Sequence, residues 1–119
     1  MKIGVIHATA NAVAPLMEEF GKAEEPVQIL NYVNENLLLT VNEHGVDSKA
    51  LRMFARLVFE VAEAGVDGIL VACSVFCRYI PFVRPFVTVP VIGIDRPMLE
   101  KAVRCGHRLG VVATTATAA

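Results

Sequence analysis

Cys73 is the residue in this sequence best suited to chemistry, because it leaves an apolar segment and enters a turn. Residues 68–72 read GILVA, and Cys73 and Ser74 follow directly. Free backbone N–H groups and a helix dipole at such a turn favour an anion, which predicts a lowered thiol pKa. A thiolate there can act as a nucleophile or as a proton-abstracting base. The alternative is that Cys73 is a small buried hydrophobic residue.

Polar residues also follow the other segments that are expected to form strands. The strands are expected at residues 2–7, 26–30, 68–72, 89–94 and 109–113. Besides Cys73 and Ser74, the polar residues at the carboxyl ends of these strands are His7, Thr9, Asn31, Asp95, Thr114, Thr115 and Thr117. Hydroxyl groups and backbone N–H groups in such turns can bind a carboxylate. Turn capping is the alternative for the threonines, and a satisfied core histidine is the alternative for His7.

Helical segments separate these strands and position them. The clearest covers residues 48–64, where Leu51, Phe54, Leu57, Val58 and Val61 repeat on one face. Further helices are expected after Asn11 as a cap, over residues 34–43, in a short irregular stretch near Pro81 and Pro85, and from Asp95 to Cys105.

Strands that alternate with helices and are apolar throughout indicate an α/β fold. We expect a parallel sheet of about four or five strands with helices on both faces, in the flavodoxin-like order 2-1-3-4-5. Ligands of such sheets bind beyond the carboxyl ends of the strands where the strand order reverses. That point lies between the first and third strands, and therefore between residues 7–9 and 73–74.

The remaining cysteines are expected to be structural. Cys77 lies four residues after Cys73, which is not the C-x-x-C spacing of redox proteins, although a thiol protein using both remains an alternative. Cys105 ends a helix at the opposite edge of the sheet. Neither spacing predicts a metal site. The first turn, HATANA, lacks both glycine-rich nucleotide-binding patterns.

The composition is that of one globular domain. The chain has 119 residues, of which 55% are hydrophobic, with 11 basic and 12 acidic side chains. The near balance of charge argues against nucleic acid as a partner, and no apolar run is long enough to span a membrane. Three irregularly spaced cysteines favour a reducing, cytoplasmic setting over a disulfide framework.

Taken in order, these motifs resemble the aspartate/glutamate racemase superfamily. The segment 65–95, GVDGILVACSVFCRYIPFVRPFVTVPVIGID, is similar to the family's first catalytic cysteine, fourth strand and following turn. KIGVIHAT resembles the first strand with its ligand loop, and RLGVVATTATA resembles the strand and threonine-rich loop that open the second half. The resemblance covers nearly the whole chain.

The resemblance implies a cofactor-independent amino-acid racemase acting on a small carboxylate such as aspartate or glutamate. Members have two facing α/β lobes, and a cysteine from each flanks the substrate's α-carbon. One thiolate removes the proton and the other thiol returns one. Carried over, Cys73 is the first-lobe acid/base. Thr9, Ser74, Thr114, Thr115 and Thr117, and less directly Asn11 and His7, are candidates for binding the substrate.

The chain departs from the family pattern because no cysteine follows Cys105. Residues 1–113 would form a racemase-like lobe, and residues 114–119 would begin the second-lobe loop of an apparently truncated protein. We therefore expect an inactive half that self-associates or needs a missing second lobe. The alternative function is a non-catalytic lobe that binds a small anion or a partner.

Overall fold

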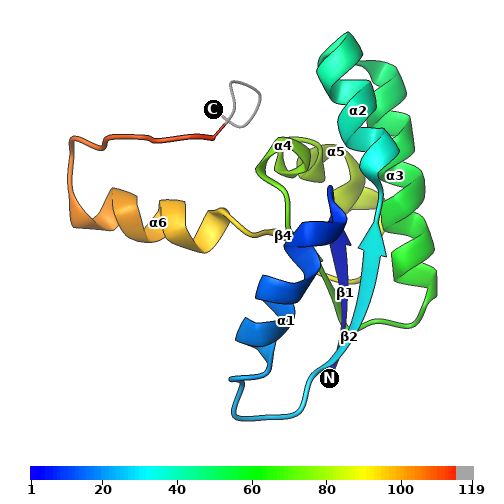
Figure 1. Ribbon diagram of the computed structural model, residues 1–119, viewed down its shortest axis with the longest axis horizontal. Coiled ribbons are helices and arrows are strands. Elements are labelled where there is room, and N and C mark those ends of the chain that lie inside the picture. The colour runs from blue at the N-terminus through cyan, green and yellow to red at the C-terminus, as the bar shows by residue number, and fades with distance from the viewer. Residues whose placement is uncertain (115–119) are drawn as a thin grey trace.

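A four-stranded parallel sheet forms the centre of the molecule. The computed structural model describes residues 1–114. The strands are β1 (Lys2–His7), β2 (Gln28–Val33), β3 (Gly68–Val71) and β4 (Val91–Gly93), in the order β2-β1-β3-β4 (Figure 1). The α/β class and the first four positions of the expected strand order are confirmed.

Helices connect the strands and lie close to the expected segments. They are η1 (Ala10–Ala12), α1 (Val13–Phe20), α2 (Glu35–His44), α3 (Ser48–Glu63), α4 (Ser74–Cys77), α5 (Ile80–Val83), η2 (Arg84–Phe86) and α6 (Arg96–Cys105). The Asn34 side chain caps α2 and the Asp47 side chain caps α3 by accepting backbone N–H bonds. Asn11 does not cap α1 as expected, because a short 3₁₀ turn precedes that helix and Ala12 is its cap.

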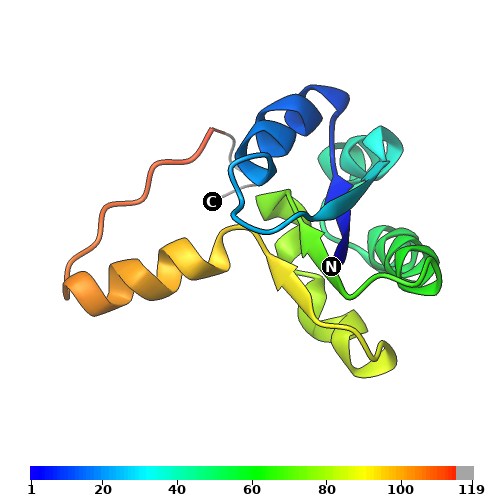
Figure 2. The same cartoon turned by 90° about the horizontal axis from the view of Figure 1, so that it is seen from below.

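The two faces of the sheet are covered to different extents. In β1, Gly4 and Ile6 point toward α3, whereas Ile3 and Val5 point to the face of α1, as the alternation along a strand requires. Helices α3, α4 and α5 lie on the first face, and α1 lies on the second (Figures 1 and 2). The expected helices on both faces are confirmed, but α1 covers only part of its face.

A cluster of aromatic rings packs the segment after Cys73 against the long helix α3. The ring centroid of Phe54 lies 6.1 Å from that of Phe76 and 5.7 Å from that of Tyr79. All three side chains are buried. Such ring pairs contribute about 0.5–1.5 kcal/mol beyond their buried area. The cluster therefore holds the turn that carries Cys73 in a defined place.

The expected fifth strand at residues 109–113 is not formed. Helix α6 projects away from the sheet, and the chain after it runs apart from β4 (Figure 1). Leu109, Val111 and Val112 are exposed. A β-branched run becomes a strand only where it finds a hydrogen-bonding neighbour, and the direction of α6 keeps this run from the edge of the sheet.

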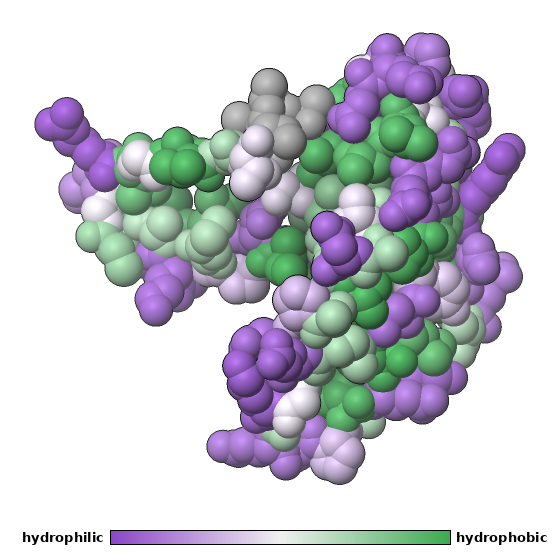
Figure 3. Space-filling view, viewed as in Figure 1, coloured by the Kyte–Doolittle hydropathy of each residue, from purple (hydrophilic) through white to green (hydrophobic). Residues whose placement is uncertain are grey.

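Apolar surface remains exposed beside and along α6. Ile92 and Ile94 are exposed on the α1 face of the sheet, and Met98, Leu99 and Val103 are exposed on α6. Figure 3 shows hydrophobic surface along this helix and next to its base. Among the described residues, no helix has the length and hydropathy that a membrane crossing requires.

Gly4 tests the packing of the sheet against α3. A Cβ atom added at Gly4 would overlap the Val61 side chain, whereas one added at Gly106 would meet nothing within 4 Å. We predict that Gly4→Ala lowers the free energy of unfolding by about 1–3 kcal/mol, because overpacking forces neighbours to shift. Urea denaturation measures this, with Gly106→Ala as the control. Equal stability of the two variants would contradict the packing described here.

Candidate functional site

A cavity lies at the carboxyl edge of the sheet, between the loops that follow β1 and β3. Its volume is about 270 Å³. It is lined by residues from both loops, from α2 and α4, and from the chain after α6: Ala8, Thr9, Ala12, Leu38, Asn42, Ala72, Cys73, Ser74, Val75 and Thr114. A cavity therefore lies at the edge of the sheet where the site was expected. Its lining includes Thr9, Cys73, Ser74 and Thr114.

Cys73 is the residue at which β3 turns into α4. Its backbone is extended, and its carbonyl accepts hydrogen bonds from the N–H groups of Phe76 at 3.0 Å and Cys77 at 3.2 Å. The thiol is half-buried and unpaired. Cys73, at the end of a central strand, is one of the residues that line the cavity.

Burial raises the pKa of the Cys73 thiol above its ordinary value. The backbone N–H groups of Phe76 and Val75 lower it, and the nearby charge of Asp95 raises it further. The expected lowering of this pKa is therefore wrong. Helix α4 has only four residues, so its dipole is short, and the loss of water around the sulfur outweighs the two backbone groups. The thiol is consequently protonated at neutral pH.

Thr9 presents its hydroxyl from the loop after β1. The Thr9 hydroxyl donates to Asn11 Oδ1 at 2.5 Å, and the next N–H group, of Ala10, donates to Glu35 Oε1 at 3.3 Å. Asn11 itself is not among the residues that line the cavity. Asn11 and Glu35 thus hold the loop in place, and Thr9 is the polar residue among the three from this segment that line the cavity, with Ala8 and Ala12.

His7 lies inside the fold rather than in the cavity. Its side chain is fully buried, and its Nε2 atom forms a hydrogen bond of 2.9 Å with Asn31 Oδ1. Asn31 in turn donates to the Met17 sulfur at 3.3 Å. Within residues 1–114, His7 Nδ1 has no hydrogen-bonding partner. His7 is therefore a core residue outside the cavity lining, with one of its two ring nitrogens hydrogen-bonded.

The expected threonine loop is described only at its start. Thr114 lines the cavity. Thr115 and Thr117 lie outside the described residues. No group of three or more potential metal-binding side chains gathers within residues 1–114.

Leu38 and Asn42 line the cavity from α2, and sequence reasoning did not select either of them. They lie four residues apart and therefore on one face of the helix. That spacing is visible in the sequence, but it does not say which face of α2 looks toward Cys73. The packing of α2 over the edge of the sheet decides this (Figure 1).

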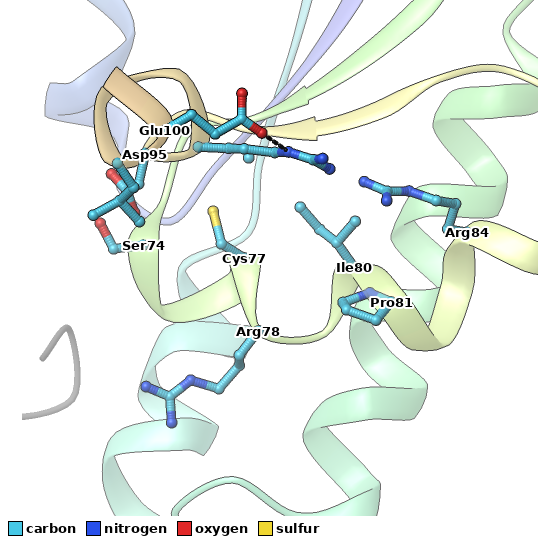
Figure 4. Close-up of a pocket in the computed structure, with 11 residues that line it drawn as sticks. Ser74, Cys77, Arg78, Ile80, Pro81, Arg84, Asp95 and Glu100 are labelled. Atoms are coloured by element: carbon cyan, nitrogen blue, oxygen red, sulfur yellow. Dashed lines mark hydrogen bonds and ion pairs between the residues drawn. The ribbon is translucent and has the colours of Figure 1, made fainter. Parts of the chain in front are cut away.

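Cys77 lines a different cavity, of about 430 Å³, between α4, α5 and the start of α6 (Figure 4). Its sulfur donates to the Val71 carbonyl at 3.7 Å. Burial, with a further contribution from Asp95, raises the pKa of this thiol to about 11. Cys73 and Cys77 therefore line two different cavities.

The pH dependence of alkylation tests the protonation state of Cys73. We predict that the rate of its modification by iodoacetamide is low at neutral pH and still rises above pH 9.0, the ordinary thiol value, because only the thiolate reacts. Peptide mass spectrometry separates Cys73 from the exposed Cys105, which serves as the internal comparison. A rate for Cys73 that levels off below pH 9.0 would refute a raised pKa.

Comparison with known proteins assigns the chain to a family. A search of curated proteins and a search of solved structures found no match. A family model described as Asp/Glu/Hydantoin racemase matches residues 3–119. The match covers the first strand, the cavity and Cys73. The chain therefore belongs to the Asp/Glu/Hydantoin racemase family, which confirms the resemblance seen in its sequence.

Proposed function

We propose that this chain supplies one acid/base group, Cys73, to a cofactor-independent racemase of small amino acids or related carboxylates. Membership of the family supports a racemase or isomerase type of function. The observation that carries the proposal is the position of the Cys73 thiol in a cavity of about 270 Å³ beside the hydroxyls of Thr9 and Ser74. That volume suits a small amino acid, and the hydroxyls suit its carboxylate.

The raised pKa gives Cys73 the role of proton donor. A base on the opposite face of the substrate removes the α-proton, and the electron pair of the C–H bond passes into the carboxylate as an enediolate. The Cys73 thiol then delivers its proton to the near face of the α-carbon and becomes a thiolate. In the reverse direction that thiolate removes the proton. In this family the opposing base is expected to be a cysteine of a second lobe.

Hydroxyl and backbone N–H groups around the sulfur hold the carboxylate in this proposal. Ser74 follows Cys73 at the start of α4, and Thr9 and Thr114 line the same cavity. Thr115 and Thr117 would extend the same set. The Thr9 hydroxyl donates its one proton to Asn11 in the structure, so in this proposal it turns from Asn11 to donate to the carboxylate when the substrate binds. Donors aimed at the carboxylate oxygens stabilise the negative charge that develops during proton removal.

In this proposal the two-base reaction needs a second cysteine opposite Cys73. No cysteine follows Cys105 in this sequence. We therefore propose that the chain alone binds the carboxylate but hardly racemises it. We also propose a reducing compartment such as the cytoplasm, because Cys73, Cys77 and Cys105 are all free thiols.

Protection of Cys73 from alkylation tests the binding site. We predict that saturating L-aspartate or L-asparagine slows the reaction of Cys73 with iodoacetamide at least severalfold and leaves Cys105 unchanged, because a bound carboxylate shields the sulfur. The variant Ser74→Ala should weaken this protection. If no small carboxylate changes the alkylation rate of Cys73, the proposed binding site is wrong.

Exchange of the substrate's α-proton in deuterium oxide tests whether the chain alone is catalytic. The α-proton signal should exchange no faster than it does without protein, because this proposal assigns the opposing base to a second lobe. Enzyme-like exchange that disappears in Cys73→Ser would show that the chain is a complete catalyst, contrary to this expectation.

We further propose that the exposed apolar surface around β4 and α6 is covered by self-association. Light scattering at increasing concentration should give a dimer or larger species, because burying this surface removes apolar area from water. Ile92→Glu should favour the monomer, whereas Phe86→Glu, which changes a more exposed apolar residue away from this surface, should not. A monomer at all concentrations would contradict the proposal.

A further inference from the structure

An apolar groove lies open on the α1 face of the sheet, between α1 and β4. Ile92 lies in β4, and Ile94 continues the strand by donating its N–H to the Val71 carbonyl at 3.0 Å. Both isoleucine side chains therefore point to this face, and both are exposed. Leu16 and Phe20 lie one turn apart on α1. Leu16 lines a hollow of about 340 Å³ together with Ile94, and one turn further on Phe20 lines a second, of about 390 Å³, together with Ile92. These two hollows form what we call the α1–β4 groove.

Helix α6 carries an apolar stripe that stays open to solvent. Its apolar residues recur three and four positions apart and so share one side of the helix: Met98, Leu99, Ala102 and Val103. No residue of α6 is buried within the part of the chain that the structure describes, so its own copy does not cover this stripe. Sheets of the α/β class bury both faces under helices. The chain thus leaves open an apolar sheet face and an apolar helix face that could cover it (Figure 3).

The segments that carry these two surfaces have opposite charges. Residues 13–25, which contain α1 and the turn after it, have a net charge of −3 from Glu18, Glu19, Lys22, Glu24 and Glu25. Residues 96–108, which contain α6 and the segment after it, have a net charge of +3 from Arg96, Glu100, Lys101, Arg104 and Arg108. Among the described residues, Glu18, Lys101 and Arg104 form no ion pair. Helix α6 therefore matches the groove in apolar character and complements α1 in charge.

We propose that α6 of a second copy of this chain packs into the α1–β4 groove. Its apolar stripe covers Ile92 and Ile94, and its basic residues lie beside the carboxylates of α1. Because each copy has both the groove and the helix, a two-fold axis forms this contact twice in one dimer. The contact rests on the self-association included in the proposed function, and it goes further by naming the two segments that meet.

Charge reversal on each segment of the full chain tests the proposal. One variant combines Glu18→Lys with Glu19→Lys on α1, and the other combines Lys101→Glu with Arg104→Glu on α6. All four side chains are exposed. Each variant alone brings like charges together, so sedimentation at low salt should give a dimer dissociation constant raised at least tenfold. An equimolar mixture should form a heterodimer with about the affinity of the unmodified chain, because both contacts then join opposite charges again.

The matched control combines Glu60→Lys with Glu63→Lys, which are exposed on α3 at the other face of the sheet. It makes the same change in net charge as the α1 variant and should leave the dimer unchanged. A dimer of the α6 variant as tight as that of the unmodified chain would overturn the α6 contact and leave self-association standing. A mixture no tighter than either variant alone, with both variants folded by circular dichroism, would also overturn it. A monomeric unmodified chain would overturn self-association and this contact together, whereas the role of Cys73 is decided separately by its alkylation.

Discussion

The parallel pairing of β1 with β3 is the constraint on which the cavity depends. Ile6 lies opposite Val71, and the N–H of Ala72 donates to the Ile6 carbonyl at 2.8 Å, so the two strands end side by side. Residues 8–9 and 72–74 then leave the sheet together. The loops that follow two neighbouring parallel strands lie at the same edge of the sheet. Here one of these loops carries a hydroxyl group and the other carries a thiol.

Burial behind that edge determines the chemical state of the thiol. The aromatic rings of Phe54, Phe76 and Tyr79 pack α4 and the turn after it against α3, and the partly buried Cys73 packs against the same core. The same packing that fixes the position of the sulfur therefore raises its pKa. A protonated, positioned thiol is suited to giving a proton, and it becomes a base only after doing so. The position of the thiol and the direction of its pKa shift are thus two results of one packing arrangement.

The surface beside β4 is less well packed than the region around Cys73. Helix α6 leaves the sheet directly after Asp95, and residues 109–112 have no strand beside them. The α1 face consequently keeps Ile92 and Ile94 exposed.

The sequence alone was sufficient for the parallel α/β class, for the order of the first four strands and for the place of Cys73. Continuous apolar runs mark buried strands, a 3.6-residue period marks α3, and chain order places Cys73 directly after β3. These features depend on neighbours in the chain. The family was also recognisable from motif order, as the match over residues 3–119 confirms.

Other features depended on contacts between residues far apart in the chain. The period of α2 does not tell which of its faces looks toward β3, so Leu38 and Asn42 could not be selected. The direction of the Cys73 pKa shift required the balance between desolvation and two N–H groups, which only packing determines. The apolar run at 109–113 had the composition of a strand, but without a neighbouring strand it stays exposed. Tertiary structure decided these points, because burial, orientation and strand pairing are properties of the assembled fold.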